Sequence, residues 1–339
     1  MRSPGECLAL ARLAPIALLV VVLLPRPGLA FEGFDTQAFK PPTDPDGYVI
    51  VEGSRALEGH IIDRLFRFLV GIPPPDEPQP IEVHASAYFN YARNPLTTSE
   101  RGDRPTREII EDLSQLDLVV GIGVLPRVQV GVVLPIVLNR DGFDFEDPSS
   151  EIREHGIGSL RVDMKVEVVR AREEEDVFGL AVKGFVQTPT GRERDFADND
   201  HRVTGGFVLV PELRPAKFLR VALNIGYEYF DGQIEVGGTR VDDKVLLALG
   251  IGLDLAKLTG VTAIEGLEVV AEVTHFTRLC NPYDREEESP VELGGAIRFN
   301  RGLFLLVGGS AGLNEAIGAP DGRVFAAVGF TSRLFEGRP

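Results

Sequence analysis

Hydrophobic and polar residues alternate along residues 219–230, which show the pattern of this chain most clearly. The odd positions from Leu219 to Tyr229 are apolar or aromatic, whereas the even positions include Arg220 and Glu228. Because successive side chains of a strand point to opposite faces, this pattern predicts a strand with one apolar face and one polar face. The stretch is also long enough to cross a bilayer as a tilted strand, which takes about 9–11 residues.

Similar segments recur from residue 81 to residue 334, separated by polar stretches or by stretches that contain Gly and Pro. Twelve such segments are present, an even number, as in bacterial single-chain barrels. The predicted strands are residues 81–92, 113–124, 128–138, 157–169, 178–188, 202–210, 218–230, 245–256, 267–276, 291–299, 303–313 and 324–334.

The connections between these segments alternate in length, and every second one is longer and polar. Outer-membrane barrels have short periplasmic turns and long external loops, whereas a soluble sandwich has no reason to alternate in this way. We therefore predict an all-β fold, an antiparallel transmembrane β-barrel of about twelve strands over residues 81–335. A secreted, soluble β-sandwich that acts as a binding protein is the alternative.

The first thirty residues have the order of a secretory signal peptide. Arg2 and Arg12 lie in the basic N-terminal region, and the apolar run 14–24 follows. The small residues of a cleavage site come last, at 28–30. The apolar run is short for a membrane span of about 20 residues. We expect residues 1–30 to be a cleaved signal peptide that exports the protein.

Residues 31–80 are predicted to form an irregular periplasmic extension that carries one short amphipathic helix. Apolar residues recur there at helical spacing, and a proline-rich stretch at 73–78 ends the pattern. We expect the extension to pack on the barrel; the helix could instead rest on the membrane surface or plug the lumen. The apolar residues of the helix are Ile61, Ile62, Leu65, Phe66 and Leu69.

The charge of the chain excludes one class of partner. Its 339 residues have a formal charge of −16, and an acidic surface repels the phosphates of nucleic acids. After loss of residues 1–30 Cys280 is the remaining cysteine, so we expect neither an intrachain disulfide nor a cysteine metal cluster. The chain has no tryptophan, so Tyr and Phe would have to form the aromatic girdles of a barrel.

No constellation of catalytic residues is evident, so we predict that the protein is not an enzyme and has no catalytic residues, cofactor or metal. An outer-membrane hydrolase, a less favoured alternative, would need His155 or His201 beside a nucleophile. Two acidic loop clusters could bind divalent cations but lack the Gly and terminal Glu of a calcium loop, which favours solvated loops. They are Asp141, Asp144, Glu146 and Asp147, and Asp195, Asp198 and Asp200.

Charged residues on the polar faces of the strands are the candidate functional residues, because these faces would point into the lumen. Paired charges could close the lumen, or they could line a narrow aqueous path for small polar solutes. The lumen-lining candidates are Arg161, Asp163, Lys165, Glu167, Lys183, Arg220, Glu228, Asp254, Glu268, Glu272, Glu292 and Arg298.

Four stretches together resemble the N-terminal barrel region of OmpA-type outer-membrane proteins of Gram-negative bacteria. A fifth, residues 188–191, resembles the phenol-degradation-pathway-like transporter barrels of the outer membrane. The chain stops at Pro339, after the last predicted strand, so the peptidoglycan-binding domain of the OmpA-type proteins is not expected. The four stretches are residues 41–48 (PPTDPDGY), 90–96 (NYARNPL), 156–161 (GIGSLR) and 318–325 (GAPDGRVF).

The resemblance implies an integral protein of the bacterial outer membrane, either structural or a passive, porin-like channel for small solutes. It also implies contact with membrane lipid and lipopolysaccharide. Residues 324–330 resemble the C-terminal signal that the barrel-assembly machinery reads, so we expect that machinery as a partner during biogenesis. The sequence predicts neither the solute nor the oligomeric state.

Overall fold

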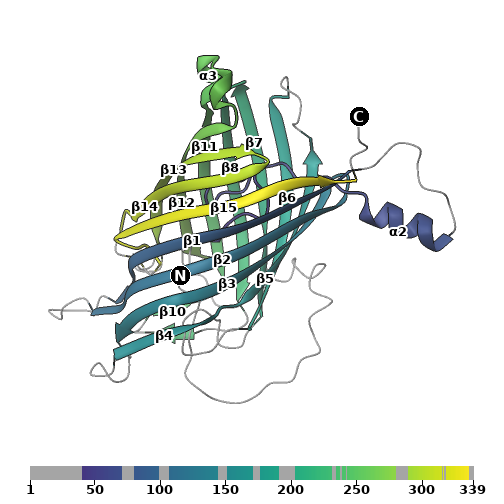
Figure 1. Ribbon diagram of the computed structural model, residues 1–339. Coiled ribbons are helices and arrows are strands. Elements are labelled where there is room, and N and C mark those ends of the chain that lie inside the picture. Colours follow the sequence, from purple (N-terminus) through teal and green to yellow (C-terminus); the bar gives the residue numbers. More distant parts are fainter. Residues whose placement is uncertain are drawn as a thin grey trace.

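The wall of the molecule is a closed antiparallel β-barrel (Figure 1). β1 pairs with β15 on one side and with β2 on the other, and β2 pairs with β3, which closes the ring. The computed structural model describes residues 40–70, 80–98, 107–143, 151–170, 176–190, 203–230, 234–236, 239–241, 243–279, 289–314, 316 and 318–335.

The twelve predicted strands are all present, and the prediction of a barrel is confirmed. β4 and β5 occupy one position of the wall because both pair with β3, so the thirteen strands of the sheet fill twelve positions. Closure of the ring excludes the sandwich alternative. The strands are β1 (Ile81–Thr98), β2 (Arg107–Leu125), β3 (Val128–Phe143), β4 (Glu151–Ile157), β5 (Leu160–Val169), β6 (Phe178–Thr188), β7 (Thr204–Ala216), β8 (Leu219–Phe230), β11 (Lys244–Asp254), β12 (Leu267–Arg278), β13 (Val291–Arg301), β14 (Leu303–Gly312) and β15 (Gly322–Leu334).

The break between β4 and β5 was not predicted, because residues 157–169 were expected to form one strand. It lies opposite Pro135 of β3, which has no N–H to donate to a neighbouring strand. The carbonyl of Pro135 instead accepts a hydrogen bond from the N–H of Gly158, at 2.8 Å. The wall therefore stays continuous across the interruption.

The two ends of the barrel differ in their connections. At one end, called here the short-turn end, β2 and β3, β7 and β8, and β13 and β14 are joined by tight turns. This end also carries α3 (Leu255–Thr259) and a 3-10 turn (Thr262–Ile264) between β11 and β12, neither of which was predicted. A small hairpin, β9 (Ile234–Val236) with β10 (Thr239–Val241), lies in the connection between β8 and β11 at the opposite end.

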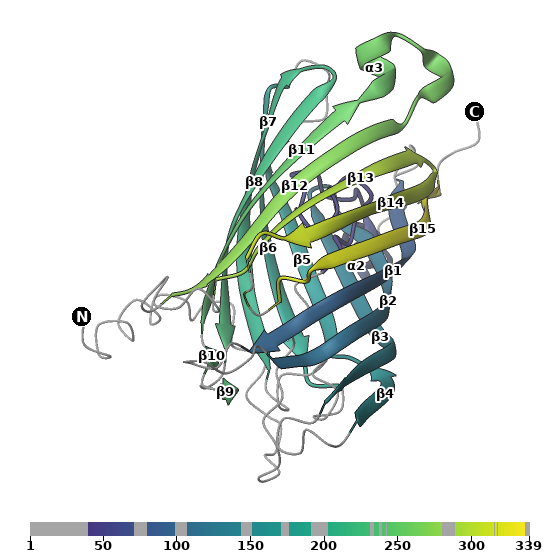
Figure 2. The same cartoon turned by 90° about the vertical axis from the view of Figure 1, so that its left-hand side faces the viewer.

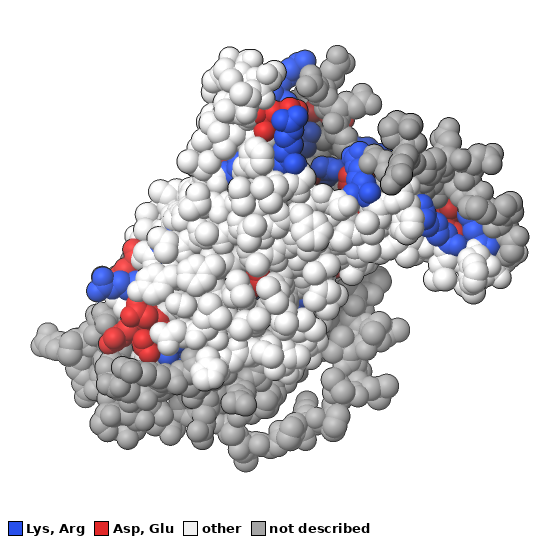
Figure 3. Space-filling model, viewed as in Figure 1, with Lys and Arg blue, Asp and Glu red and all other residues white. Residues whose placement is uncertain are grey.

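The outer surface of the barrel wall is apolar. In β8, Leu223 and Ile225 are exposed whereas Ala222 and Asn224 are buried, as the alternation predicts for a barrel that is wet or packed inside. The face of the barrel shown in Figure 3 is almost free of charged atoms between its two ends. No helix in the described part of the chain is long and apolar enough to cross a membrane.

The predicted helix is present as α2 (Ile61–Val70), and it lies outside the barrel (Figure 1). The residues before it do not follow the prediction of a periplasmic extension. Residues 40–59, called here the luminal segment, lie inside the barrel, where the view of Figure 2 shows their trace surrounded by strands. The helix does not plug the lumen; the residues before it fill the interior instead, which was not predicted. The predicted signal peptide lies outside the described residues.

A closed wall makes a testable prediction about behaviour in detergent. The continuous ladder of strand pairs should resist dodecyl sulfate at room temperature and unfold on boiling. We expect the unboiled protein to migrate faster than the boiled protein on a gel. Identical migration of the two samples in every mild detergent would contradict a closed barrel.

Candidate functional site

The luminal segment passes through the barrel and leaves it at the short-turn end. Near its start, the Nζ atom of Lys40 donates a hydrogen bond to Oε1 of Gln187 on β6, at 2.8 Å. At its end, the N–H of Gly59 donates to the carbonyl of Leu125, where β2 turns into β3. The segment therefore occupies the interior that a twelve-stranded wall would otherwise leave empty.

The size of the barrel explains why it needs such a filling. Eight strands enclose an interior that their own side chains fill, whereas barrels of sixteen or more strands enclose a channel. Twelve strands lie between these cases. Tyr48, Val49 and Val51 are fully buried in one apolar cluster with wall residues that include Tyr88 and Phe304.

Small wall residues allow the segment to approach closely. A Cβ at Gly250 of β11 would lie 2.8 Å from Cγ of Tyr48, and a Cβ at Gly131 of β3 would lie 2.4 Å from Cβ of Thr43. Both distances are shorter than carbon contacts allow. Glycine is thus required at these positions by the packed segment, in addition to any role in the strand.

Glu272 of β12 holds the centre of the segment by its backbone. One carboxylate oxygen, Oε2, accepts hydrogen bonds from the N–H groups of Val49, Ile50 and Val51, at 3.1, 3.0 and 3.2 Å. Backbone N–H groups away from water need partners, and an irregular segment has few of its own. The buried carboxylate of Glu272 supplies them, and its own charge is stabilised by three donors.

Polar wall side chains hold the rest of the segment in the same way. Asn224 of β8 makes two hydrogen bonds to the backbone of Glu52, accepting from its N–H at 2.8 Å and donating to its carbonyl at 3.1 Å. Glu212 of β7 accepts from the N–H of Ser54 at 3.0 Å. These contacts fix the path of the backbone rather than the identity of its side chains.

A buried chain of ion pairs links the segment to β5 and β6. Negative and positive side chains alternate along this row of ion pairs, and the three carboxylates balance the three cations. Two of the carboxylates belong to the luminal segment, whereas all three cations belong to the wall. In order, the members are Asp44, Lys165, Glu52, Lys183, Asp163 and Arg161.

A second cluster lies nearer the short-turn end. Glu268 of β12 binds the guanidinium groups of both Arg220 and Arg298. Arg298 also donates to backbone carbonyls of the segment, including that of Pro45 at 3.0 Å, and the guanidinium of Arg220 lies 4.1 Å from the centre of the Tyr48 ring. The cluster therefore joins the wall to residues 45–48, which directly precede the three residues that Glu272 binds.

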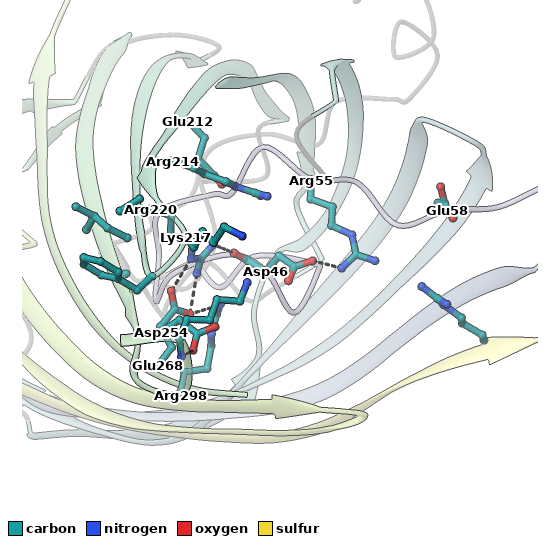
Figure 4. A pocket seen from close by; sticks show the side chains of 16 residues that line it. Asp46, Arg55, Glu58, Glu212, Arg214, Lys217, Arg220, Asp254, Glu268 and Arg298 are labelled. Carbon is teal, nitrogen blue, oxygen red and sulfur yellow. Dashed lines mark hydrogen bonds and ion pairs between the residues drawn. The ribbon is translucent and has the colours of Figure 1, made fainter. Parts of the chain in front are cut away.

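This second cluster forms the floor of a polar cavity at the short-turn end, called here the vestibule (Figure 4). The vestibule has a volume of about 580 Å³. Seven basic and five acidic side chains line it, an excess of two positive charges in a chain whose formal charge is −16. In Figure 4, Asp46 points from the segment toward Arg55, and their ion pair measures 2.6 Å.

A third group of charged and polar side chains links wall residues to one another. The guanidinium of Arg323 on β15 binds Glu292 of β13 at 2.9 Å and donates to the side-chain carbonyl of Asn90 on β1 at 3.2 Å. Ser310 of β14 also donates to Glu292. These side chains link four consecutive strands of the wall, β13, β14, β15 and β1.

Most of the lumen-lining candidates lie inside the barrel and contact the segment or each other. Glu228 is half-buried on the same face of β8 as Asn224. Asp254 is an exception: it lines the vestibule, and its side chain caps α3 by accepting the N–H of Lys257. Buried on the lumen side are Arg161, Asp163, Lys165, Glu167, Lys183, Glu268, Glu272, Glu292 and Arg298, while Arg220 is part-buried at the vestibule.

The residues that the sequence analysis missed belong mainly to the luminal segment itself. Asp44, Asp46 and Glu52 lie in a stretch without periodic pattern, so no signal placed them in the lumen. Asn224, in contrast, shares the parity of the predicted lumen-facing residues Arg220 and Glu228 on its own strand. Uncharged polar residues of that parity could have been included.

The described residues lend no support to a hydrolase. His155 is exposed on β4, whereas His201 lies outside the described residues. His84 is buried and bonded to the hydroxyl groups of Ser86 and Thr331, as expected for a structural side chain. Of the two predicted acidic loop clusters, Asp141 is described at the end of β3, and the others lie outside the described residues.

Comparison with known proteins identifies the fold. No family model and no curated protein matches the sequence. An outer membrane channel from Pseudomonas putida F1 is 12% identical with a TM-score of 0.55, covering 77% of this chain and 99% of that chain. The NanC porin is 6% identical (TM-score 0.46; 74% and 98% covered), and the Pseudomonas putida toluene transporter TodX is 9% identical (TM-score 0.38; 91% and 100%).

The first likeness shows that this chain has the fold of an outer-membrane β-barrel. The other two are too distant for a detailed comparison. Features specific to OmpA-type proteins remain predictions from the sequence.

Proposed function

We propose that the protein is a small-solute channel of the bacterial outer membrane, in which the luminal segment is the gate. The short-turn end would face the periplasm and the long loops the exterior. One observation supports the proposal most: between its two ends, the segment is held by wall side chains that bind its backbone and its acidic side chains, and its backbone hydrogen bonds to wall strands lie at its exit, at Glu58 and Gly59. The segment can therefore move out of the lumen without breaking the pairing between any two strands of the wall.

The physical chemistry of the lumen supports reversible movement. The cations Lys165 and Lys183 and the carboxylate of Glu272 can be hydrated when water replaces the segment, because hydration also satisfies charged groups. A segment held by an apolar core alone would have no such exchange partner. The wall is thus suited to both a filled and a hydrated lumen.

The vestibule indicates the class of solute. Its lining is dense in charges of both signs, with a small positive excess, so it should favour small polar or charged solutes over apolar ones. A volume of about 580 Å³ limits the solute to a small molecule. A purely structural barrel, permanently closed by the segment, is the outcome that the following experiment would reveal.

A disulfide lock tests the gate directly. Cγ of Tyr48 lies 2.8 Å from where Gly250 would carry a Cβ, so the sulfur of a cysteine at residue 48 can reach a cysteine at residue 250. We expect Tyr48→Cys/Gly250→Cys, in a Cys280→Ser background, to conduct in planar bilayers when reduced. Oxidation should abolish the openings, and reductant should restore them.

The two single cysteine variants in the same background are the matched controls. Tyr48→Cys carries the loss of packing and Gly250→Cys carries the added side chain, but neither can form the bond, so oxidant should leave the conductance of each unchanged. A double variant that conducts equally in both redox states, with the disulfide verified by mass spectrometry, would refute the gate. If no variant and no wild-type protein conducts, the channel itself is refuted.

A further inference from the structure

α2 exposes an unusually apolar surface. None of its ten residues is buried, and six of them are large apolar residues with at least half of their surface exposed. Soluble proteins seldom leave such a contiguous patch in water, and a patch of this kind marks an interaction surface. The six are Ile62, Leu65, Phe66, Phe68, Leu69 and Val70.

The polar side of α2 is narrow and is ordered by contacts of its own. Asp63 and Arg67 form an ion pair at 2.8 Å, one helical turn apart. The guanidinium of Arg64 lies 4.4 Å from the centre of the ring of Phe335, just beyond β15. The contact with Phe335 orients the helix relative to the end of the barrel, and Arg67 lies on the same side of the helix as Arg64.

α2 lies beside the short-turn end of the apolar outer wall. The chain leaves the lumen at Gly59 and enters the helix at once, and the exposed residues Phe330, Leu334 and Phe335 lie at the same end of the barrel. In Figures 1 and 3, α2 projects sideways from the barrel, with charged atoms on its upper side and uncharged residues on its lower side. The uncharged side of α2 is therefore turned toward the part of the molecule where the apolar outer wall lies.

We infer that α2 lies in the membrane interface, in the lipid leaflet at the short-turn end. Its apolar side chains would enter the acyl boundary, and Arg64 and Arg67 would remain at the level of the lipid phosphates. The inference rests on the proposed location of the barrel in a membrane, but it does not require that the lumen conducts.

Lipid fits this surface better than a protein partner does. The apolar face of α2 continues the apolar outer wall, which in a membrane is covered by lipid. A ten-residue helix is about 15 Å long, and stable protein interfaces bury about 1,200–2,000 Å² in total, more than one short helix face supplies. A second copy of the chain and a soluble protein are therefore the occupants to be tested against.

The absence of tryptophan from the chain provides a direct test. Phe68 is the most exposed of the six residues, and Phe68→Trp places a single fluorophore on the apolar face. The full-length variant is reconstituted into phosphatidylethanolamine/phosphatidylglycerol vesicles with or without brominated acyl chains. We expect bromine to quench this tryptophan about as strongly as a tryptophan at Val307, which is exposed on the outer wall of β14.

Two further variants complete the design. Arg301→Trp places the probe at an exposed charged residue of a short turn and should escape quenching. Adding Leu65→Asp and Leu69→Asp to Phe68→Trp should remove the quenching, while the heat-dependent gel shift shows that the barrel is still folded. A Phe68→Trp probe that is unquenched would overturn the inference.

Dilution separates lipid from a second copy. Quenching by bromolipid should be unchanged when the ratio of lipid to protein is raised, because each chain brings its own helix to the leaflet. The tryptophan could instead be shielded from bromolipid at high protein density and become quenched, or exposed to water, only on dilution. Such a result would identify a second copy of the chain as the occupant. That result would also overturn the inference.

Discussion

Removal of residues 41–59 should convert the protein into an open pore with a conductance several times that of the wild type. The deletion removes the apolar residues that fill the interior, while every strand pair of the wall remains. Water then fills the lumen and hydrates the charges that the segment had paired. Single-channel recording in planar bilayers measures the change in conductance and in open time.

The same deletion should change ion selectivity in a defined direction. Residues 41–59 carry four acidic residues and one basic residue, a net charge of −3. Without Asp44 and Glu52, Lys165 loses both of its carboxylate partners, and Lys183 retains Asp163, which also binds Arg161. The reversal potential in a salt gradient should therefore shift toward anion permeation.

Folding of the deletion variant is checked by the heat-dependent shift on a gel. A charge-matched control keeps the segment but neutralises it, with Asp44→Asn and Glu52→Gln, and should shift selectivity less because the segment still occupies part of the lumen. A folded deletion variant with the conductance and selectivity of the wild type would mean that residues 41–59 are not the barrier.

Glu272→Ala should increase the open probability more than any other single substitution in the wall. It leaves three buried N–H groups of the segment without their acceptor, and one such buried group costs about 1–3 kcal/mol. A loss of about 3 kcal/mol would raise the ratio of displaced to seated segments on the order of 100-fold. Glu272→Gln keeps an acceptor oxygen but loses the charge, so its effect should be smaller.

Glu292→Ala is the matched control for Glu272→Ala. Glu292 is similarly buried on the neighbouring strand β13, but Arg323 and Ser310, which bind it, belong to the wall. Its loss should disturb the wall without releasing the segment. Equal open probabilities for the Glu272 and Glu292 variants would show that the three backbone contacts do not hold the gate.

The wall of the barrel could be predicted from the sequence because strand alternation is local. β6 begins and ends at the predicted residues 178 and 188. The prediction failed where local chemistry was ambiguous: β7 continues to Ala216 through Pro211 and Pro215, which were interpreted as part of a turn. A proline can remain within a strand where its missing N–H is not needed by a neighbour.

The contents of the barrel could not be predicted in the same way. Residues 41–48 are rich in proline and acidic residues, which locally indicate an exposed loop. Their burial depends on Lys165 and Arg298, which are more than a hundred residues away in the sequence. Ion pairs and hydrogen bonds between residues so far apart produce no periodic pattern in a single sequence. The helix that follows was predictable because its apolar face repeats at 3.6 residues.

The pairing of β1 with β15 has a consequence for the order of folding. Ile81 pairs with Leu334, so the seam joins residues 253 positions apart (334 − 81), and contacts so distant in sequence form late. The residues that fill the interior precede β1 and are synthesised before any of the wall. They must therefore be enclosed as the seam closes, or be threaded through an end of the finished barrel afterwards. In the first case, the earliest part of the chain acts as a template around which the last strand completes the cylinder.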